Sequence, residues 1–457
     1  MSTQTPSPTT TPTSSQSANP TAERLAQIRS LHRSLVGSPW SDDLLELTMA
    51  VAISHKLSIA EGGSLLWLFL VGPSATGKTE TVESLRNSQR TMFLDTATVA
   101  SLLSGAVNDK GAQAKSLLPE LDGRCLVMKD LAPLFSDDDR AVKKFLGALT
   151  GVFDGHYDRA IGTSYGPSAV VSSHSRFSLI GCVKPDTLRE HDRHMAKLGG
   201  RVLMYRITGS AGPACLSDMS KRRGIRQTLA KLVEAHLADA EARLSAVTLA
   251  PDHSAALSDM AELVAKGRTP IFSEQYFVEG QRRYESVPGS TEAPHRIVEQ
   301  LAILLRSLAA VNGRTVSSGR ELDVVQRVAL SSVLTGRAEV LEAIRSQPVS
   351  RVVRYTVNVD GQEEDLCVEW QGTTVPVCAR LIGRSVDQTR NRLNDLVRLG
   401  LLVKDEGAIR DGKGQPQDFY RPTAAFEGLM LGTFGLLDKL ADTPCAAFEE
   451  SRASTGD

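Results

Sequence analysis

What this sequence has little of already limits the classes of protein it can belong to. It contains six cysteines among 457 residues, and no two of them form a C-x-x-C pair. That spacing supports neither a zinc site nor a disulfide framework, so we expect reduced cysteines. Aromatic residues make up 5% of the chain, which counts weakly against a platform that stacks single-stranded bases.

An excess of charge and a long apolar run are missing as well. The net charge is −1, so no overall positive field draws the protein to nucleic acid, and any DNA contact must come from a local patch. The longest strongly apolar run, Leu65–Val71, is far too short to span a bilayer. The N-terminus has no apolar signal-peptide core. We therefore expect a cytoplasmic protein without membrane contact.

Composition and periodicity divide the chain into five parts. Residues 1–20, which are mostly Ser, Thr, Pro, Gln and Ala, are predicted to be a disordered tail. Residues 21–210 begin with helical segments and then alternate strand and helix patterns, which predicts an α/β domain with a mainly parallel sheet. Residues 211–348 look almost wholly helical. Residues 349–432 are typical of a helix-turn-helix with a β-hairpin, and residues 433–457 predict a C-terminal helix and flexible tail.

Short apolar runs mark the strands of the α/β part, because the strands of a parallel sheet are buried on both faces. The ranges predicted as strands are Ser64–Val71, Thr91–Asp95, Arg124–Lys129, Phe177–Val183 and Arg201–Ile207.

A phosphate-binding loop follows the first of these strands. Residues 72–79 read Gly-Pro-Ser-Ala-Thr-Gly-Lys-Thr and match the pattern G-x-x-x-x-G-K-[ST]. Backbone N–H groups of such a loop cradle phosphates, Lys78 reaches the β- and γ-phosphates, and the Thr79 hydroxyl binds Mg²⁺. The sequence therefore predicts ATP and Mg²⁺ as ligands, held by Gly72, Pro73, Ser74, Ala75, Thr76, Gly77, Lys78, Thr79 and Glu80.

Hydrolysis also needs an acidic residue at the tip of a neighbouring strand. The run Arg-Cys-Leu-Val-Met-Lys-Asp ends at Asp130, and Lys129-Asp130 stands where an Asp-Glu pair is usual. Asp130 either serves the metal with no glutamate base after it, or occupies the base position while Lys129 replaces the metal-side acid. A third interpretation is that Asp130 merely starts a loop. Asp137–Asp139 look like a solvated helix start with Ser136 as the cap.

Three basic residues complete the predicted catalytic set. Lys184 follows the strand Phe177–Val183, where a polar side chain senses the γ-phosphate; the alternative is a plain solvated lysine. Arg201 opens the last strand, where an arginine projects into a neighbouring subunit's site and neutralises transition-state charge. Arg296 lies at the start of a helix, where it can fold back onto the γ-phosphate; the alternative is a helix-surface arginine.

These residues carry a resemblance to a known family. The runs Trp-Leu-Phe-Leu-Val-Gly-Pro-Ser-Ala-Thr-Gly-Lys-Thr-Glu, Leu-Val-Met-Lys-Asp, Phe-Ser-Leu-Ile-Gly-Cys-Val-Lys-Pro and Leu-Gly-Gly-Arg-Val-Leu-Met-Tyr-Arg look like AAA+ ATPases of phages and mobile elements. Those proteins are similar in layout to minichromosome-maintenance helicases. Over residues 40–425 the resemblance implies an αβα core, a helical lid and a winged helix.

The resemblance also implies roles and an assembly. It assigns the sensor-1, arginine-finger and sensor-2 roles to Lys184, Arg201 and Arg296, and it implies a homo-oligomeric ring or open ring. Two positions depart from the family pattern: Lys129-Asp130 replaces the acidic pair, and Lys184 stands where Asn or Thr is more common. The departures make ATP binding a firmer expectation than fast hydrolysis.

The C-terminal module carries a local excess of positive charge. Thr373–Leu381 and Ser385–Leu399 predict a helix-turn-helix, with Ser385 as N-cap in a capping-box pattern. From residue 371 to residue 423 there are nine Lys or Arg and six Asp or Glu, so 9 − 6 = +3. DNA binding is therefore predicted. Phosphates would be contacted by Arg384, Arg390, Arg392, Lys404, Arg410 and Lys413, and base edges by Gln388, Thr389 and Asn391.

Three functions fit these features. The first is a DNA-associated AAA+ ATPase, a motor or loader in replication, recombination or mobile-DNA processes. The second is an ATP-gated transcriptional regulator that reads one operator. The third is a remodeller of proteins, whose winged helix docks a protein partner.

Overall fold

The structure of the chain is a computed structural model, and part of the chain lies outside the residues it describes. Residues 1–19 of the predicted tail 1–20, the predicted C-terminal segment 433–457 and Lys413 lie outside them, whereas Pro20 starts a helix. The described residues are 20–37, 40–102, 116–163, 166–191, 198–207, 219–278, 281–346, 352–359, 362–369, 372–410 and 416–431. Within them, no helix combines the length and the apolar composition that crossing a membrane requires.

A five-stranded parallel sheet forms the centre of the molecule, in the order β2-β3-β6-β1-β7. The sequence-based prediction of an α/β fold with a parallel sheet is thus confirmed. Each strand lies inside its predicted range: β1 (Trp67–Val71), β2 (Thr91–Leu94), β3 (Cys125–Met128), β6 (Ser178–Val183) and β7 (Val202–Arg206). Strands β1, β3 and β6 are buried throughout, which is why their sequences are continuous apolar runs.

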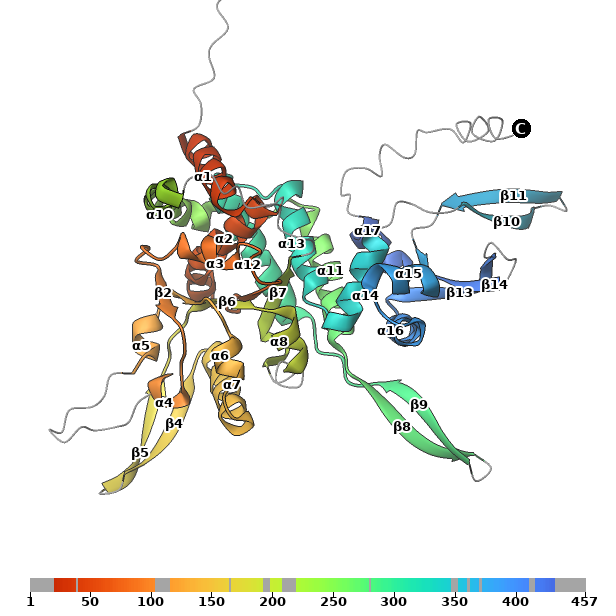
Figure 1. The fold of residues 1–457 in the computed structure, drawn as a ribbon, viewed down its shortest axis with the longest axis horizontal. Helices are drawn as coiled ribbons and strands as arrows, with labels where there is room; N and C mark the ends of the chain where they lie inside the picture. The colour runs from red at the N-terminus through yellow and green to blue at the C-terminus, as the bar shows by residue number, and fades with distance from the viewer. Residues whose placement is uncertain are drawn as a thin grey trace, which may run out of the picture.

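Helices cover both faces of this sheet (Figure 1). On one face, α1 (Pro20–Val36), α2 (Ser41–Glu61), α10 (Met219–Arg243) and α12 (His295–Val311) share a hydrophobic cluster with alternate strand residues such as Leu68 and Leu70. On the other face, Trp67 and Phe69 pack with α7 (Asp139–Phe153). Because side chains alternate along a strand, one apolar run serves two cores.

The helices that follow the sheet belong to the same packed body. Residues of α11 (His253–Arg268), α13 (Gly319–Ser331) and α14 (Thr335–Arg345) share the hydrophobic cluster of α1 and α2. The shorter helices are α3 (Lys78–Glu83), α4 (Val99–Leu102), α5 (Leu118–Leu121), α6 (Ala132–Phe135), α8 (Pro185–Glu190), η1 (Gly199–Arg201) and η2 (Leu244–Ala246). Helix α7 begins two residues later than predicted, because Asp138 rather than Ser136 caps it by accepting the N–H groups of Arg140 and Ala141.

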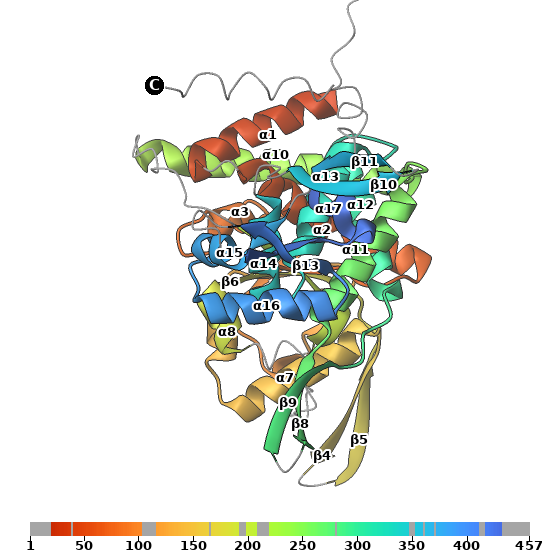
Figure 2. The same ribbon diagram turned by 90° about the vertical axis from the view of Figure 1, so that its right-hand side faces the viewer.

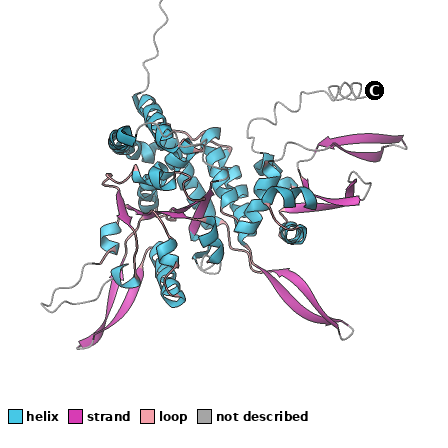
Figure 3. Ribbon diagram, in the orientation of Figure 1, coloured by secondary structure: helices cyan, strands magenta, loops and turns pink. Residues whose placement is uncertain are grey.

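Three two-stranded hairpins extend away from the packed helices (Figure 3). They are β4–β5 (Tyr157–Thr163 and Gly166–Ser173), β8–β9 (Ile271–Val278 and Gln281–Pro288) and β10–β11 (Val352–Val359 and Gln362–Glu369). Hairpin β8–β9 corrects the prediction that residues 211–348 are almost wholly helical. Hairpins β4–β5 and β8–β9 project from the same end of the molecule in both views (Figures 1 and 2).

The C-terminal part has the elements predicted from its sequence. Helix α15 (Val375–Ile382) and helix α16 (Val386–Arg398) are separated by a turn at Gly383, whose φ is +61°. They are accompanied by the sheet β12-β14-β13 and a final helix, with the bounds β12 (Thr373–Thr374), β13 (Leu402–Arg410), β14 (Pro416–Pro422) and α17 (Ala424–Leu431).

Three of the cysteines, Cys125, Cys182 and Cys378, are free and buried. Burial raises the pKa of the Cys125 and Cys182 thiols to about 12, which keeps them protonated and unreactive at neutral pH. The expectation of reduced cysteines holds for these three residues.

Candidate nucleotide-binding site

The loop Gly72–Thr79, predicted to bind phosphates, is built where three parallel strands end together. The Gly72 N–H donates to the Val183 carbonyl over 3.2 Å, and the Ile207 N–H donates to the Val71 carbonyl over 2.8 Å. These bonds fasten the carboxyl ends of β1, β6 and β7 to one another. Ligands of open α/β sheets bind at this edge, outside the carboxyl ends of the strands.

Glycine is required at the last position of the loop for two reasons. Gly77 has φ +85°, a conformation that side-chain-bearing residues rarely adopt. A Cβ atom there would also lie 2.3 Å from a Val36 methyl group of α1. The end of α1 therefore presses on the loop just before α3 begins, and no other residue type fits between them.

Lys78 lies inside the loop rather than extending into solvent. Its Nζ donates to the carbonyl oxygens of Gly72 and Pro73, both over 2.6 Å, and lies 3.2 Å from Thr76 Oγ1. The residue is buried, and burial lowers the pKa of Lys78 while the nearby Cys182 and Asp130 oppose that shift. A phosphate in the loop would offer this ammonium a charged acceptor in place of neutral carbonyls.

The loop opens onto a cavity of about 590 Å³ in which the predicted residues meet. Lys78, Thr79, Asp130 and Lys184, which are spread over more than a hundred residues of sequence, all line it. The other lining residues are Leu35, Val36, Ser74, Ala75, Thr76, Gly77, Glu80, Lys129, Val183 and Arg222. The fold thus brings together on one cavity four side chains that the sequence assigned to one site.

Lys129 and Asp130 are held differently, although they are adjacent. Lys129 Nζ lies 3.5 Å from a Glu83 carboxylate oxygen and 3.3 Å from one of Asp95, so two acidic side chains compensate its charge. Asp130 is exposed at the cavity, and its Oδ1 accepts the Ala132 N–H over 2.9 Å. Of this pair, the carboxylate is the group that can serve a metal here.

A metal bound through a nucleotide needs few protein ligands. Among the residues that the structure describes, no group of three or more His, Cys, Asp or Glu side chains could hold a metal ion by itself. Magnesium bound to nucleotide phosphates keeps several waters and takes only one or two protein oxygens. Thr79 and Asp130 are the residues whose oxygens fit that requirement.

Sequence reasoning missed one cation of the cavity, Arg222. It belongs to α10, and its Nη2 donates to the Leu35 carbonyl over 2.9 Å. Helix α10 is fastened beside the loop, because Arg226 makes two hydrogen bonds of 2.6 and 2.7 Å to the Glu80 carboxylate. Three consecutive basic residues at 221–223 were the available signal, but nothing in the sequence indicated that this helix returns to the loop.

Arg201 and Arg296 lie together at the opposite edge of the sheet. Val202 pairs with Trp67, the first residue of β1, so Arg201 is about 16 Å from the loop along the strand direction. Arg201 Nη2 donates to Asp154 Oδ2 over 2.7 Å, and Arg296 lies 3.9 Å from the same carboxylate. Both guanidinium groups stand over the Phe153 ring, at 5.9 and 5.7 Å from its centroid.

This placement corrects one expectation about Arg296. It does not fold back onto the phosphates of its own chain, because the first turns of α12 are fixed at the amino ends of the strands. Gln300, a buried residue of α12, donates to the Leu65 and Arg201 carbonyls over 3.0 and 2.9 Å. Asp154, in the turn after α7, is the ion-pair partner of both arginines.

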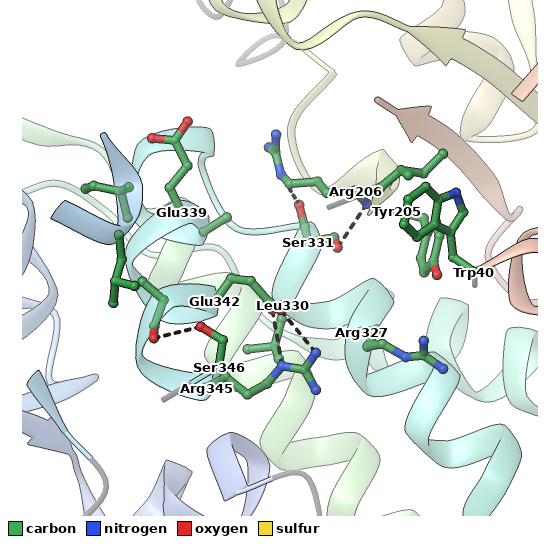
Figure 4. Close-up of a pocket in the computed structure, with 15 residues that line it drawn as sticks. Trp40, Tyr205, Arg206, Arg327, Leu330, Ser331, Glu339, Glu342, Arg345 and Ser346 are labelled. Atoms are coloured by element: carbon green, nitrogen blue, oxygen red, sulfur yellow. Dashed lines mark hydrogen bonds and ion pairs between the residues drawn. The ribbon is translucent and has the colours of Figure 1, made fainter. Parts of the chain in front are cut away.

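A second cavity, of about 530 Å³, lies between the end of β7 and helices α13 to α15 (Figure 4). Its arginines are bound within the protein: Arg206 donates to the Ser331 carbonyl over 2.9 Å, and Arg345 pairs with Glu342 at 3.1 Å. Arg206 thus fastens the end of β7 to α13.

The helix-turn-helix retains part of its predicted DNA-binding face. Gln388, Arg390 and Asn391 are exposed on α16. Thr389 is wholly buried, and its hydroxyl donates to the Ser385 carbonyl over 2.9 Å, so the prediction that it reaches a base edge is wrong. Lys404 is bonded to Glu406 and Asp418, both at 3.0 Å. The side chain of Arg410 lies outside the described residues, as does Lys413.

Two of the arginines predicted to contact phosphates form ion pairs with one and the same carboxylate. Glu339 of α14 lies 3.5 Å from Arg384 and 2.8 Å from Arg392, and it also pairs with Arg189 of α8. Burial raises the pKa of Glu339, but the bond from Arg189 and the charges of all three arginines outweigh burial and hold the pKa below its ordinary value. Glu339 therefore links α8, α14 and the helix-turn-helix.

No protein-family model matches this chain, and a search of the curated proteins finds no match. The functional argument therefore depends on the geometry of the site.

Proposed function

We propose that this chain is a DNA-associated ATPase of the AAA+ type, which binds ATP with Mg²⁺ in the loop cavity. The observation that carries the proposal is the convergence of Lys78, Thr79, Asp130 and Lys184 on one cavity at the carboxyl end of β1. A glycine-rich loop directly after a buried strand, with a lysine and a threonine at the helix start, is the arrangement that binds nucleotide phosphates.

The charges of the cavity suit a triphosphate with a metal ion. Lys78, Lys184 and Arg222 provide cations to the cavity, and Asp130 provides a carboxylate. In the proposed roles, Lys78 binds the β- and γ-phosphates, Thr79 and Asp130 serve the magnesium, and Lys184 senses the γ-phosphate. Arg222 adds a phosphate contact that couples α10 to the bound nucleotide.

Hydrolysis is proposed to need a second copy of the chain. Arg201 lies about 16 Å from the loop of its own chain, at the other edge of the sheet, and Arg296 shares its Asp154 partner there. They can reach a triphosphate only if that edge meets the loop edge of a neighbour. An arginine supplied in this way stabilises transition-state charge and contributes several orders of magnitude to the rate.

The remaining layout supports the AAA+ assignment. Helices cover both faces of the sheet, a set of helices follows it, and a helix-turn-helix with a hairpin ends the described chain. This is the order that the resemblance implies: core, lid and winged helix. Action on DNA rests on the exposed Gln388, Arg390 and Asn391 of α16.

A second function, docking of a protein partner, is favoured by one observation. The helix-turn-helix exposes apolar side chains beside the polar ones: Val377 is 37% exposed, Leu381 48% and Val386 43%. Asp387 also lies on the exposed face of α16, where it would repel phosphates. An ATP-driven protein remodeller would use such a surface.

The first experiment measures ATP binding by the full chain and by Lys78→Ala. Removal of the ammonium that holds two phosphates should weaken ATP binding by about a hundredfold or more. The matched control is Lys143→Ala, a change of the same type at an exposed position on α7. ATP binding that survives in Lys78→Ala would overturn the proposed nucleotide site.

The second experiment separates the candidate functions by ATPase rate. The rate is measured without DNA, with single-stranded or double-stranded DNA of random sequence, and with DNA from the neighbourhood of the protein's own gene. Stimulation by any DNA supports the motor or loader. Tight binding to one sequence without stimulation indicates the regulator, and indifference to all DNA indicates the protein remodeller.

A further inference from the structure

Hairpin β8–β9 concentrates exposed aromatic side chains. Phe272 is 57% exposed, Tyr276 41%, Phe277 64% and Tyr284 66%. Among the side chains that the structure describes, every Phe, Tyr or Trp in the exposed class lies on this hairpin. A chain with only 5% aromatic residues thus carries four of them in the open on sixteen strand residues.

The strand register assigns these residues to two faces. Phe277 pairs with Arg282 and Gln275 pairs with Tyr284, so these four side chains form one face near the tip. We call this face, completed by Ser273 and Ser286, the aromatic face. The side chains diagonal to each other across the strands, such as Phe277 and Tyr284, are within reach of one another.

The opposite face has a different charge. There Tyr276 pairs with Arg283, and Glu274 lies directly opposite Glu285, a like-charged pair that destabilises the hairpin in isolation. The aromatic face has an arginine and no carboxylate among its six residues. A polyanion is therefore accepted by one face and repelled by the other.

The hairpin projects from the body of the molecule (Figures 1 and 2). Packing against the rest of the chain therefore explains few of its aromatic side chains. A two-stranded hairpin is only marginally stable in water unless another surface covers it. At its base Phe272 lies against the backbone of Gly289, which accounts for that residue alone. Phe277 and Tyr284, nearer the tip, remain to be covered by a partner.

Single-stranded nucleic acid matches the aromatic face in each of its components. Aromatic rings stack on unpaired bases without regard to sequence, and arginine pairs with the phosphates between them. The Gln275 amide and two serine hydroxyls add neutral hydrogen-bonding groups. A duplex offers no accessible base faces, so the rings select for unpaired strands.

We propose that the aromatic face of hairpin β8–β9 binds single-stranded nucleic acid by stacking bases on Phe277 and Tyr284, with Arg282 on the phosphate backbone. The proposal deepens the DNA-associated function and depends on it for its biological setting. It does not depend on the helix-turn-helix, which lies in a separate part of the chain and would contact duplex DNA. In this proposal the projecting hairpin binds one strand of nucleic acid.

The test measures fluorescence anisotropy of labelled oligomers of about 30 nucleotides, long enough for a single-strand site, with the full chain and no ATP. Arms with oligo-dT, oligo-rU and a duplex of the same length distinguish DNA, RNA and paired strands. The double variant Phe277→Ala/Tyr284→Ala should weaken single-strand binding about tenfold or more. Duplex binding should be unchanged.

Matched controls lie on the opposite face of the same strands. Tyr276→Ala removes an exposed ring there and should change single-strand affinity by less than about twofold. Arg282→Glu and Arg283→Glu make the same charge change at adjacent positions, and only Arg282→Glu should weaken binding strongly. Equal losses for both faces, or no loss in Phe277→Ala/Tyr284→Ala, would overturn the assignment.

The failure of this proposal is distinguishable from that of the proposed function. A chain that binds ATP but no single-stranded nucleic acid overturns the hairpin proposal alone and indicates a protein occupant for the aromatic face. A chain that fails to bind ATP, yet loses single-strand affinity in Phe277→Ala/Tyr284→Ala, overturns the ATPase and retains the hairpin site.

Discussion

At the scale of single residues, the site shows which roles a sequence pattern can assign. Lys78 and Thr79 were assigned by a local motif, because the backbone of eight consecutive residues fixes where both side chains lie. Asp130 and Lys184 were assigned because the carboxyl ends of parallel strands meet at one edge. Arg222 was missed and Arg296 was misplaced, since the position of each depends on how a distant helix packs.

The buried histidines give a prediction about pH. Burial lowers the pKa of His32 to about 4 and that of His55 to about 4, below the value of about 6.5 in an unfolded chain. Between about pH 6.5 and pH 4 the two histidines therefore bind protons in the unfolded chain but not in the folded chain. The free energy of unfolding falls as the pH is lowered through this range. The loss is on the order of 3 kcal/mol for each histidine.

Urea denaturation at a series of pH values measures this effect. The variant His32→Gln removes the titrating group, whose ring nitrogens lie 2.6 Å from Ser41 Oγ and 2.9 Å from Thr81 Oγ1. Its stability is expected to be lower at pH 7 but to depend less steeply on pH between 6.5 and 4. An unchanged pH dependence in His32→Gln would show that the pKa of His32 is the same in the folded and the unfolded protein.

At the scale of elements, the strands of the sheet were predictable and the projecting hairpins were not. Burial on both faces made β1, β3 and β6 continuous apolar runs. Hairpin β8–β9 is exposed over almost its whole length, so no core-facing period appears in its sequence. The same exposure that concealed the hairpin from pattern analysis left its aromatic side chains available for a ligand.

Glu339 offers a test of how the helix-turn-helix is restrained. In Glu339→Gln, Arg384 and Arg392 lose their charged partner and become available to DNA phosphates. Duplex affinity should increase, and the slope of log K against log salt should steepen by about one to two units, since each phosphate contact contributes about 0.9. The measurement is duplex binding over a range of salt concentrations.

The control for this change lies one helical turn away. Glu342→Gln makes the same substitution on α14, but Glu342 pairs with Arg345 of its own helix. It should leave the salt slope unaltered. If Glu339→Gln gives the wild-type slope, Arg384 and Arg392 do not contact phosphates.

At the scale of the whole molecule, two half-sites lie on opposite edges of one sheet. The cavity with Lys78 is at the carboxyl edge, and Arg201 with Arg296 is at the amino edge. In the proposed function, a single copy has the groups that bind ATP, while the arginines proposed for hydrolysis lie at its other edge. ATP binding per chain should therefore not depend on protein concentration, whereas the ATP hydrolysis rate per chain should.

Arg201→Ala tests this division. ATP binding should stay within about twofold of wild type, and the hydrolysis rate should drop by at least about a hundredfold. Added to the wild-type protein, the variant should reduce the ATPase rate by more than its share of the mixture. The control Arg140→Ala removes an exposed arginine of α7. Full hydrolysis by Arg201→Ala would place the catalytic arginine elsewhere.

The loop edge and the arginine edge lie at opposite ends of the sheet strands, so contacts between copies through these edges have a direction. A contact that joins the loop edge of one copy to the arginine edge of the next is head-to-tail, so a two-fold symmetric dimer cannot complete both of its sites. Such contacts propagate until they close into a ring or end in a filament. In a random equal mixture of Lys78→Ala and Arg201→Ala chains, each inactive alone, about a quarter of the contacts would then join an intact loop to an intact arginine edge. Each contact takes its loop from one chain and its arginine from the next.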